Sequence, residues 1–130
     1  MKRLLIVDDE PAIVRMIQKV AEGCGFAVTI TTNSDEFMER VVDSDPDVIV
    51  MDLSMPGTDG VELIRNLAAT QCSAKILIIS GFDPRVLETT GLLGKTLGLT
   101  ISGTINKPVR VALLREMIND LQREPAVEQG

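Results

Sequence analysis

Three segments of the chain are unbroken apolar runs of strand length, and a polar residue closes each of them. They are Leu4–Val7, Val48–Met51 and Ile76–Ile79. Such runs are typical of parallel strands that are covered on both faces. Residues 26–31 and 99–105 instead alternate between apolar and polar side chains. Because alternation marks strands with one less covered face, these two segments are predicted to be the edges of the sheet.

Helical patterns lie between the predicted strands. The first begins near Pro11 and ends at Gly23 and Gly25, with apolar positions at Ile13, Ile17, Val20 and Cys24. The second runs from Ser34 to Val42. The third follows a capping box, Asp59-Gly60-Val61-Glu62, and has Val61, Ile64 and Ala68 on one face. The last carries the apolar residues Leu113, Leu114, Met117, Ile118 and Leu121.

One further helix is expected between Ser80 and Leu99. Gly91 and Gly94 fall inside it, and each costs roughly 0.8–1.0 kcal/mol relative to alanine. This helix is therefore predicted to be the least stable element. The same glycines would also permit close packing against the sheet, and the sequence leaves that alternative open.

Alternating strands and helices require a parallel sheet with right-handed crossovers. The pattern predicts an α/β fold: a flavodoxin-like, doubly wound, five-stranded parallel sheet in the order 2-1-3-4-5, with helices on both faces. Residues 1–123 are predicted to form one domain, and residues 124–130 a flexible tail or the start of a linker. In such sheets function sits outside the carboxyl ends of the strands, near the switch point between strands one and three.

Composition narrows the class of protein. The net charge is −6 and no predicted helix carries a basic stripe, which argues against direct nucleic-acid binding. The run Leu4–Val7 is too short for a signal peptide core or a membrane span, so a cytoplasmic protein without membrane contact is expected. Cys24 and Cys72 have no metal-type spacing and are predicted to be buried, reduced thiols.

Polar residues follow four of the predicted strands. Strand one ends in Asp8-Asp9-Glu10, strand three in Asp52 and strand four in Ser80, and Lys107 follows strand five. A single aspartate at such a place is more often a helix cap, a role open to Asp9. Three carboxylates crowded together would repel one another unless a divalent cation bound them, and hard oxygen ligands with room for water favour Mg²⁺.

The same side chains predict a chemistry. With part of the charge neutralised, Asp52 on the central strand is the best placed carboxylate to act as a nucleophile toward phosphorus. The ammonium of Lys107 and the hydroxyl of Ser80 would position the phosphoryl oxygens and compensate their charge. Because the chain contains no His, the phosphoryl group would come from a separate protein or a small donor.

Taken together, these motifs resemble the receiver domain of two-component response regulators. The resemblance covers roughly residues 2–122 and is carried by Val7-Asp8-Asp9-Glu10, by Met51-Asp52-Leu53-Ser54-Met55-Pro56-Gly57-Thr58-Asp59-Gly60, by Ser80-Gly81 and by Asn106-Lys107-Pro108. It implies Asp8 and Asp9 as an acidic pair, Asp52 as phosphoacceptor and metal ligand, the Ser54 carbonyl as a further Mg²⁺ ligand, Ser80 and Lys107 as phosphoryl contacts, and a cis bond before Pro108.

The resemblance also implies partners. A sensor histidine kinase or a phosphotransfer protein would supply the phosphoryl group, and a downstream output domain or protein would receive the signal. Residues 97–104 resemble receivers that precede cyclic-dinucleotide phosphodiesterase domains of the EAL type. Thr104 stands where the family commonly has an aromatic switch residue, and Phe82 stands where polar residues can position hydrolytic water, so slow autodephosphorylation is expected.

Three other functions would suit an α/β domain of this kind. A phosphohydrolase with an aspartyl nucleophile would want a second acid at position 54, which is Ser54. A flavin or dinucleotide binder would need a phosphate loop after strand one, where Asp8-Asp9-Glu10 would repel phosphate. A receiver-shaped module that binds partners without phosphorylation stays open. The chain is expected to be a phosphoacceptor that assists its own phosphoryl transfer, and not an enzyme in the ordinary sense.

Overall fold

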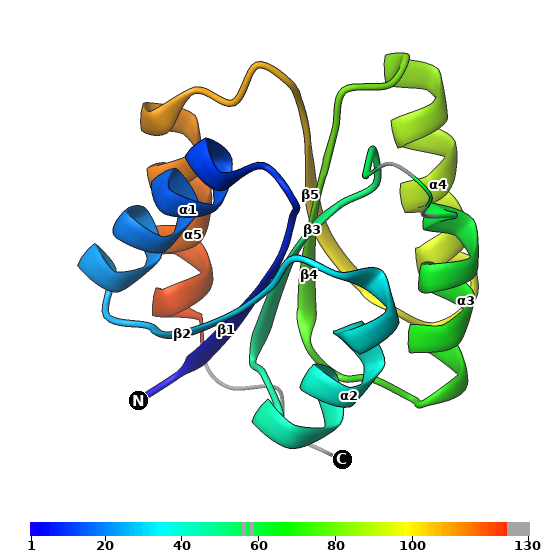
Figure 1. The fold of residues 1–130 in the computed structure, drawn as a ribbon, viewed down its shortest axis with the longest axis horizontal. Helices are drawn as coiled ribbons and strands as arrows, with labels where there is room; N and C mark the ends of the chain where they lie inside the picture. Colours follow the sequence, from blue (N-terminus) through cyan, green and yellow to red (C-terminus); the bar gives the residue numbers. More distant parts are fainter. Residues whose placement is uncertain (56, 58, 125–130) are drawn as a thin grey trace.

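The computed structural model describes residues 1–55, 57 and 59–124, in which strands and helices alternate (Figure 1). The elements are β1 (Arg3–Val7), α1 (Pro11–Gly23), β2 (Ala27–Thr31), α2 (Ser34–Ser44), β3 (Val48–Asp52), α3 (Gly60–Ala69), β4 (Lys75–Ser80), α4 (Pro84–Thr96), β5 (Thr100–Asn106) and α5 (Val111–Arg123). The strands form one parallel sheet in the order β2-β1-β3-β4-β5. The predicted flavodoxin-like fold is therefore confirmed.

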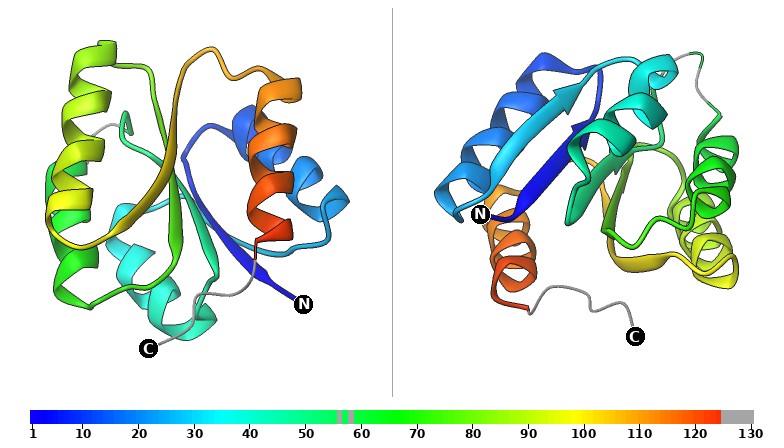
Figure 2. Two further views of the ribbon diagram at one scale, coloured as in Figure 1. Left: turned by 180° about the vertical axis from the view of Figure 1, so that it is seen from behind. Right: turned by 90° about the horizontal axis from the view of Figure 1, so that it is seen from below.

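Helices cover both faces of the sheet. Helices α1 and α5 pack together on one face, and α2, α3 and α4 cover the other (Figure 2). Successive residues of a strand point to opposite faces, so Leu4 and Ile6 pack under α1 and α5 while Leu5 and Val7 pack under the other three helices. This two-sided burial explains why the central strands are unbroken apolar runs.

The exact faces of three helices differ from the sequence expectation. In α3 the predicted face included Val61, which is exposed, whereas Leu63, Ile64 and Leu67 are buried. In α1 the buried residues include Val14 and Ala21, whereas Ile13 and Cys24 are only partly buried. In α5, Leu113 is exposed although its neighbour Leu114 is fully buried. An apolar stripe on a helix can be broader than the face that meets the sheet, and the sequence pattern alone does not fix its centre.

Strand β5 changes its inward face part-way along. The alternation of burial predicted for residues 99–105 is present, but the register with β4 shifts between Ile76 and Leu77. As a result Ile101 packs on the α4 side of the sheet, whereas Ile105 packs on the α5 side. The bulge inserts one extra residue, which reverses the direction of every side chain after it.

The two glycines inside α4 face β5 rather than solvent. Both are buried, and a Cβ on Gly94 would lie 2.9 Å from Cδ1 of Ile101, whereas one on Gly91 would lie 3.4 Å from Cγ2 of Thr104. Close packing, the alternative that the sequence left open, is thus what the structure shows. The low intrinsic stability predicted for this helix stays a prediction.

These contacts predict that alanine at position 91 and alanine at position 94 have different effects on the free energy of unfolding. Both variants gain the same helix propensity, roughly 0.8–1.0 kcal/mol, but only Gly94→Ala forces Ile101 to move. We expect Gly91→Ala to be more stable than Gly94→Ala by roughly 1–3 kcal/mol, the usual cost of overpacking, in urea unfolding. Equal stability of the two variants would show that α4 does not pack on β5 as described.

Candidate functional site

The candidate site lies at the carboxyl ends of the strands, where β1, β3 and β4 turn into their loops (Figure 1). Asp8 and Asp9 follow β1, and Asp52 is the last residue of β3. One carboxylate oxygen from each of these three residues lies within 4.8 Å of the other two. The convergence predicted from the sequence is therefore present, because neighbouring parallel strands end at the same edge of the sheet.

Asp8 is a buried member of the cluster with one carboxylate oxygen left unpaired by the described residues. Its Oδ1 accepts a hydrogen bond from the backbone N–H of Glu10 at 2.9 Å. Among the residues that the structure describes, its Oδ2 is a buried side-chain oxygen without a hydrogen-bond partner. Burial is the main reason that the pKa of Asp8 rises from 3.8 to about 6, and the nearby charge of Asp52 adds to it. An unpaired, buried carboxylate oxygen beside two other carboxylates is what a cation would compensate.

Asp52 is fixed by contacts from two directions. Its side chain is 1% exposed, and its Oδ2 accepts a hydrogen bond from Nζ of Lys107 at 3.0 Å. Its Oδ1 accepts from the backbone N–H of Ser54 at 2.8 Å and from the Ser54 hydroxyl at 2.6 Å. The sequence suggested only the carbonyl of Ser54, so the contact of its hydroxyl is a feature that the sequence missed.

Lys107 reaches the site from the end of β5. Burial alone would lower the pKa of its ammonium, but hydrogen bonds to Glu10 and Asp52 outweigh burial and raise the pKa above its usual value. The bond between Lys107 and Pro108 is cis, as the resemblance implied. The charged form of Lys107 is therefore held beside Asp52.

Ser80 ends β4 and is fully buried. Its Oγ accepts a hydrogen bond from the backbone N–H of Phe82 at 2.9 Å, which leaves the hydroxyl proton free to be donated. Its carbonyl accepts from the backbone N–H of Lys107 at 2.8 Å and from Nδ2 of Asn106 at 3.1 Å. The backbone of Ser80 is thus tied directly to Lys107. Asn106 belongs to the motif quoted for the resemblance, but its hydrogen bond to Ser80 was not predicted.

The structure decides two capping roles that the sequence suggested, one for Asp9 and one for Asp59. The N-cap of α1 is Glu10, and no side chain caps this helix, so a capping role for Asp9 is wrong. Asp59 does cap α3, since its Oδ1 accepts from the N–H groups of Val61 and Glu62. Thr104, at the position where the resemblance led us to expect an aromatic residue, is exposed and lies against Gly91.

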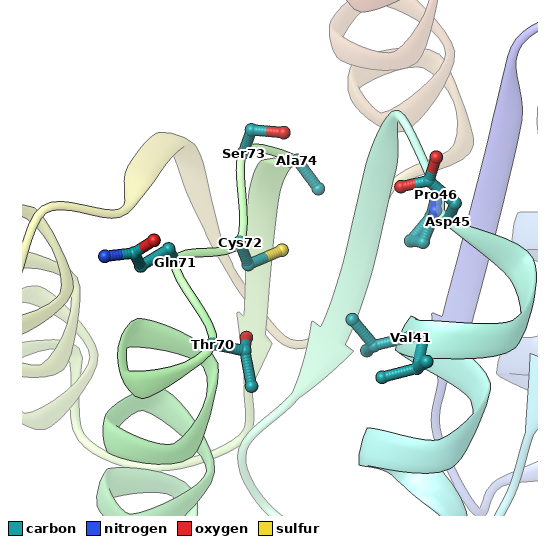
Figure 3. A pocket seen from close by; sticks show the side chains of 9 residues that line it. Val41, Asp45, Pro46, Thr70, Gln71, Cys72, Ser73 and Ala74 are labelled. Carbon is teal, nitrogen blue, oxygen red and sulfur yellow. The ribbon is translucent and has the colours of Figure 1, made fainter. Parts of the chain in front are cut away.

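A separate pocket lies at the opposite end of the sheet, between the carboxyl end of α2 and the loop from α3 to β4 (Figure 3). Cys72 points into it from that loop. Both cysteines are free and half-buried rather than fully buried, and burial raises the pKa of the Cys72 thiol. The thiol form of Cys72 is therefore favoured.

Comparison with known families decides the identity of this arrangement. Residues 4–119 match the family model of the response regulator receiver domain. The chain belongs to this family. Two relatives show how far the similarity extends. The alkaline phosphatase synthesis transcriptional regulatory protein PhoP of Bacillus subtilis is 31% identical over 91 residues, 70% of this chain and 38% of that protein. The regulatory protein VirG of Agrobacterium tumefaciens is 35% identical over 111 residues, 85% of this chain and 40% of that protein.

This receiver domain thus spans about two fifths of the length of those relatives. Among solved structures, a response regulator from Colwellia psychrerythraea superposes with a TM-score of 0.80 at 29% identity, covering 93% of this chain and 96% of that one. A CheY-like receiver from Methanospirillum hungatei gives the same TM-score at 24% identity and supports the fold. No helix in the described part of the receiver is long and apolar enough to cross a membrane.

Proposed function

We propose that this receiver accepts a phosphoryl group on Asp52, with Mg²⁺, from a phosphohistidine on a sensor histidine kinase or a phosphotransfer protein. The observation that carries the proposal is the meeting of three carboxylates with the ammonium of Lys107. A nucleophilic carboxylate with a cation on either side suits phosphoryl transfer, in which positioning and charge compensation do most of the work.

The donor set fits Mg²⁺ better than a softer metal. All three side chains offer hard carboxylate oxygens. We assign the metal to Asp9, Asp52 and the carbonyl of Ser54, with Asp8 orienting bound waters through its unpaired oxygen. When bound, the ion would supply positive charge against the carboxylates and the phosphoryl oxygens.

The residues of this chain would then act as follows. An oxygen of Asp52 forms a bond to phosphorus while the bond from phosphorus to the donor nitrogen breaks, and the imidazole leaves with that electron pair. The ammonium of Lys107 and the hydroxyl of Ser80 both donate hydrogen bonds to the phosphoryl group. The product is an acyl phosphate on Asp52.

The phosphohydrolase alternative is weakened by the geometry of Ser54. A phosphohydrolase would need a general acid at position 54, whereas the hydroxyl of Ser54 donates a hydrogen bond to the nucleophile, Asp52.

The alternative of a receiver that works without phosphorylation predicts the same fold but no phosphoryl uptake. Intact mass spectrometry after incubation with acetyl phosphate separates the two. We expect one phosphoryl group per chain with Mg²⁺ and none when the metal is chelated; no uptake in either condition would overturn the proposal.

We propose that the acyl phosphate is long-lived. The side chain of Phe82 is 49% exposed and lines a mostly apolar pocket with Leu53, Val61 and Val86, to which Asp59 and Thr90 also contribute. An aromatic ring cannot orient a water molecule by hydrogen bonding. Phe82→Glu is therefore expected to lose its phosphoryl group several-fold faster than the wild type. This increase is smaller than the factor of roughly 100 or more that general acid–base assistance can give.

The decay of phosphorylated protein, followed by intact mass, tests this expectation. Phe82→Ala is the matched control, since it removes the ring without adding a polar group. If Phe82→Glu decays no faster than Phe82→Ala, the side chain at position 82 does not govern the lifetime.

We further propose that phosphorylation alters the surface around α4 and β5. Lys107 and Ser80 are joined through their backbones, and the loops that carry them flank this helix. With Thr104 in place of an aromatic residue, the packing of Gly91 and Gly94 on β5 is the contact that would shift. The changed surface would act on an output domain or a separate protein in the cytoplasm, without direct contact to nucleic acid or membrane.

A further inference from the structure

Lys107 is shared between two carboxylates. Its Nζ donates to Oδ2 of Asp52 at 3.0 Å and to Oε1 of Glu10 at 2.8 Å. Glu10 belongs to the acidic run after β1, but neither the metal site nor the phosphoryl contacts proposed above involve it. Glu10 and Lys107 lie 97 residues apart in the chain, so their contact exists only because β1 and β5 end at the same edge of the sheet.

Glu10 is anchored at its backbone and free at its side chain. Its N–H donates to Oδ1 of Asp8, and its carbonyl accepts from the N–H of Val14 in the first turn of α1. The side chain is 55% exposed, whereas that of Asp52 is 1% exposed. The Glu10 carboxylate can therefore swing toward solvent, which the Asp52 carboxylate cannot do.

The contact has no evident structural purpose. Glu10 stands at the N-cap of α1, yet its side chain makes no capping hydrogen bond. An ion pair with one half-exposed partner contributes little to folding. The contact does, however, occupy one of the three N–H donors of the ammonium that the phosphoryl group would need.

We propose that Glu10 competes with the phosphoryl group for the ammonium of Lys107 and so favours the unphosphorylated receiver. This inference rests on the proposed function. A phosphoryl group on Asp52 places new negative charge beside Lys107 and repels the Glu10 carboxylate. Phosphorylation would then require Lys107 to release Glu10, which turns to solvent.

Removing the charge of Glu10 should therefore favour the phosphorylated form. Glu10→Gln keeps the length of the side chain and an acceptor oxygen but removes the charge. We expect this variant to bind beryllofluoride, an anion that imitates a phosphoryl group on a carboxylate, about three- to fivefold more tightly, the upper range for a partly exposed ion pair. The gain should shrink at high salt because a pair of this kind is screened.

The affinity is measured by following backbone amide signals in NMR spectra during titration at saturating Mg²⁺. Glu62→Gln is the matched control, since Glu62 is exposed on α3 and the same net charge is removed from a residue that forms no ion pair with Lys107 in the described part of the chain. Asp52→Asn is titrated in parallel. The Lys107 ammonium signal without metal reports whether the contact with Glu10 exists in solution, and it should change in Glu10→Gln but not in Glu62→Gln.

The outcomes separate this inference from the proposed function. If wild type and Asp52→Asn both fail to bind beryllofluoride, the proposed function and this inference fall together. If wild type binds through Asp52 but Glu10→Gln binds equally or more weakly, only the competition by Glu10 is overturned. An equal gain in Glu62→Gln would also overturn it, because net charge and not the contact would be responsible.

Discussion

Replacing Asp9 with alanine is expected to lower the affinity of the receiver for Mg²⁺ by more than about tenfold and to stop phosphoryl uptake. Asp9 is the exposed member of the three-carboxylate cluster, so it can present an oxygen to a hydrated ion. Loss of a partner that only supports a ligand already costs roughly 10–100-fold in metal affinity. Loss of a ligand should cost at least as much.

Mg²⁺ titration followed by NMR, with acetyl phosphate uptake measured on the same samples, provides the test. Asp43→Ala is the matched control, because Asp43 lies on α2 and pairs only with Arg40 at 3.6 Å among the described ion pairs. If Asp9→Ala bound Mg²⁺ as tightly as Asp43→Ala and accepted a phosphoryl group to the same extent, the metal site would have to lie elsewhere.

Replacing Asp8 with asparagine is expected to stabilise the metal-free receiver at neutral pH. The pKa of Asp8 is raised in the folded protein, from 3.8 to about 6. Between these two values the folded chain keeps a proton that the unfolded chain has lost, so the free energy of unfolding falls as pH rises. Asp8→Asn removes the titrating carboxyl group, and with it this fall in the free energy of unfolding.

The gain should be roughly 1–3 kcal/mol, fully present above about pH 6 and absent below the ordinary pKa of 3.8. Urea unfolding across this range, with and without Mg²⁺, measures it. The wild type should be stabilised by Mg²⁺ more than the variant, since the ion compensates the charge that asparagine lacks. A metal-free Asp8→Asn protein less stable than wild type at neutral pH would contradict this account of Asp8.

The fold was predictable because the sequence shows both which strands are central and that a helix lies between successive strands. Unbroken runs such as Val48–Met51 distinguish central from edge strands, and helical patterns between them leave few topologies for a parallel sheet. The meeting of Asp8, Asp9 and Asp52 follows from that topology. Their proximity needed no knowledge of side-chain packing.

Other features depend on contacts that a sequence pattern does not carry. The bulge that sends Ile101 and Ile105 to opposite faces leaves their alternation unchanged. The pairing of Glu10 with Lys107 depends on the rotamers of two long side chains. The packing of Gly94 on β5 could be weighed against flexibility only once the distance to Ile101 was known.

Some predictions remain to be tested. The structure brings the predicted site residues together, but their roles in phosphoryl transfer await the experiments above. The narrower resemblance of residues 97–104 to receivers that precede EAL-type domains also stays a prediction. Of the predicted tail, 124–130, only Glu124 lies within the described residues, where it pairs with Lys75.

The central claim is that Asp52 is the phosphoacceptor, and locating the phosphoryl group tests it most directly. The receiver is incubated with acetyl phosphate and Mg²⁺, and the modified residue is identified by peptide mass spectrometry, with Asp52→Asn treated in parallel. We predict one hydroxylamine-labile phosphoryl group on Asp52 and none on the variant. A phosphoryl group on another residue, or equal labelling of Asp52→Asn, would contradict the account.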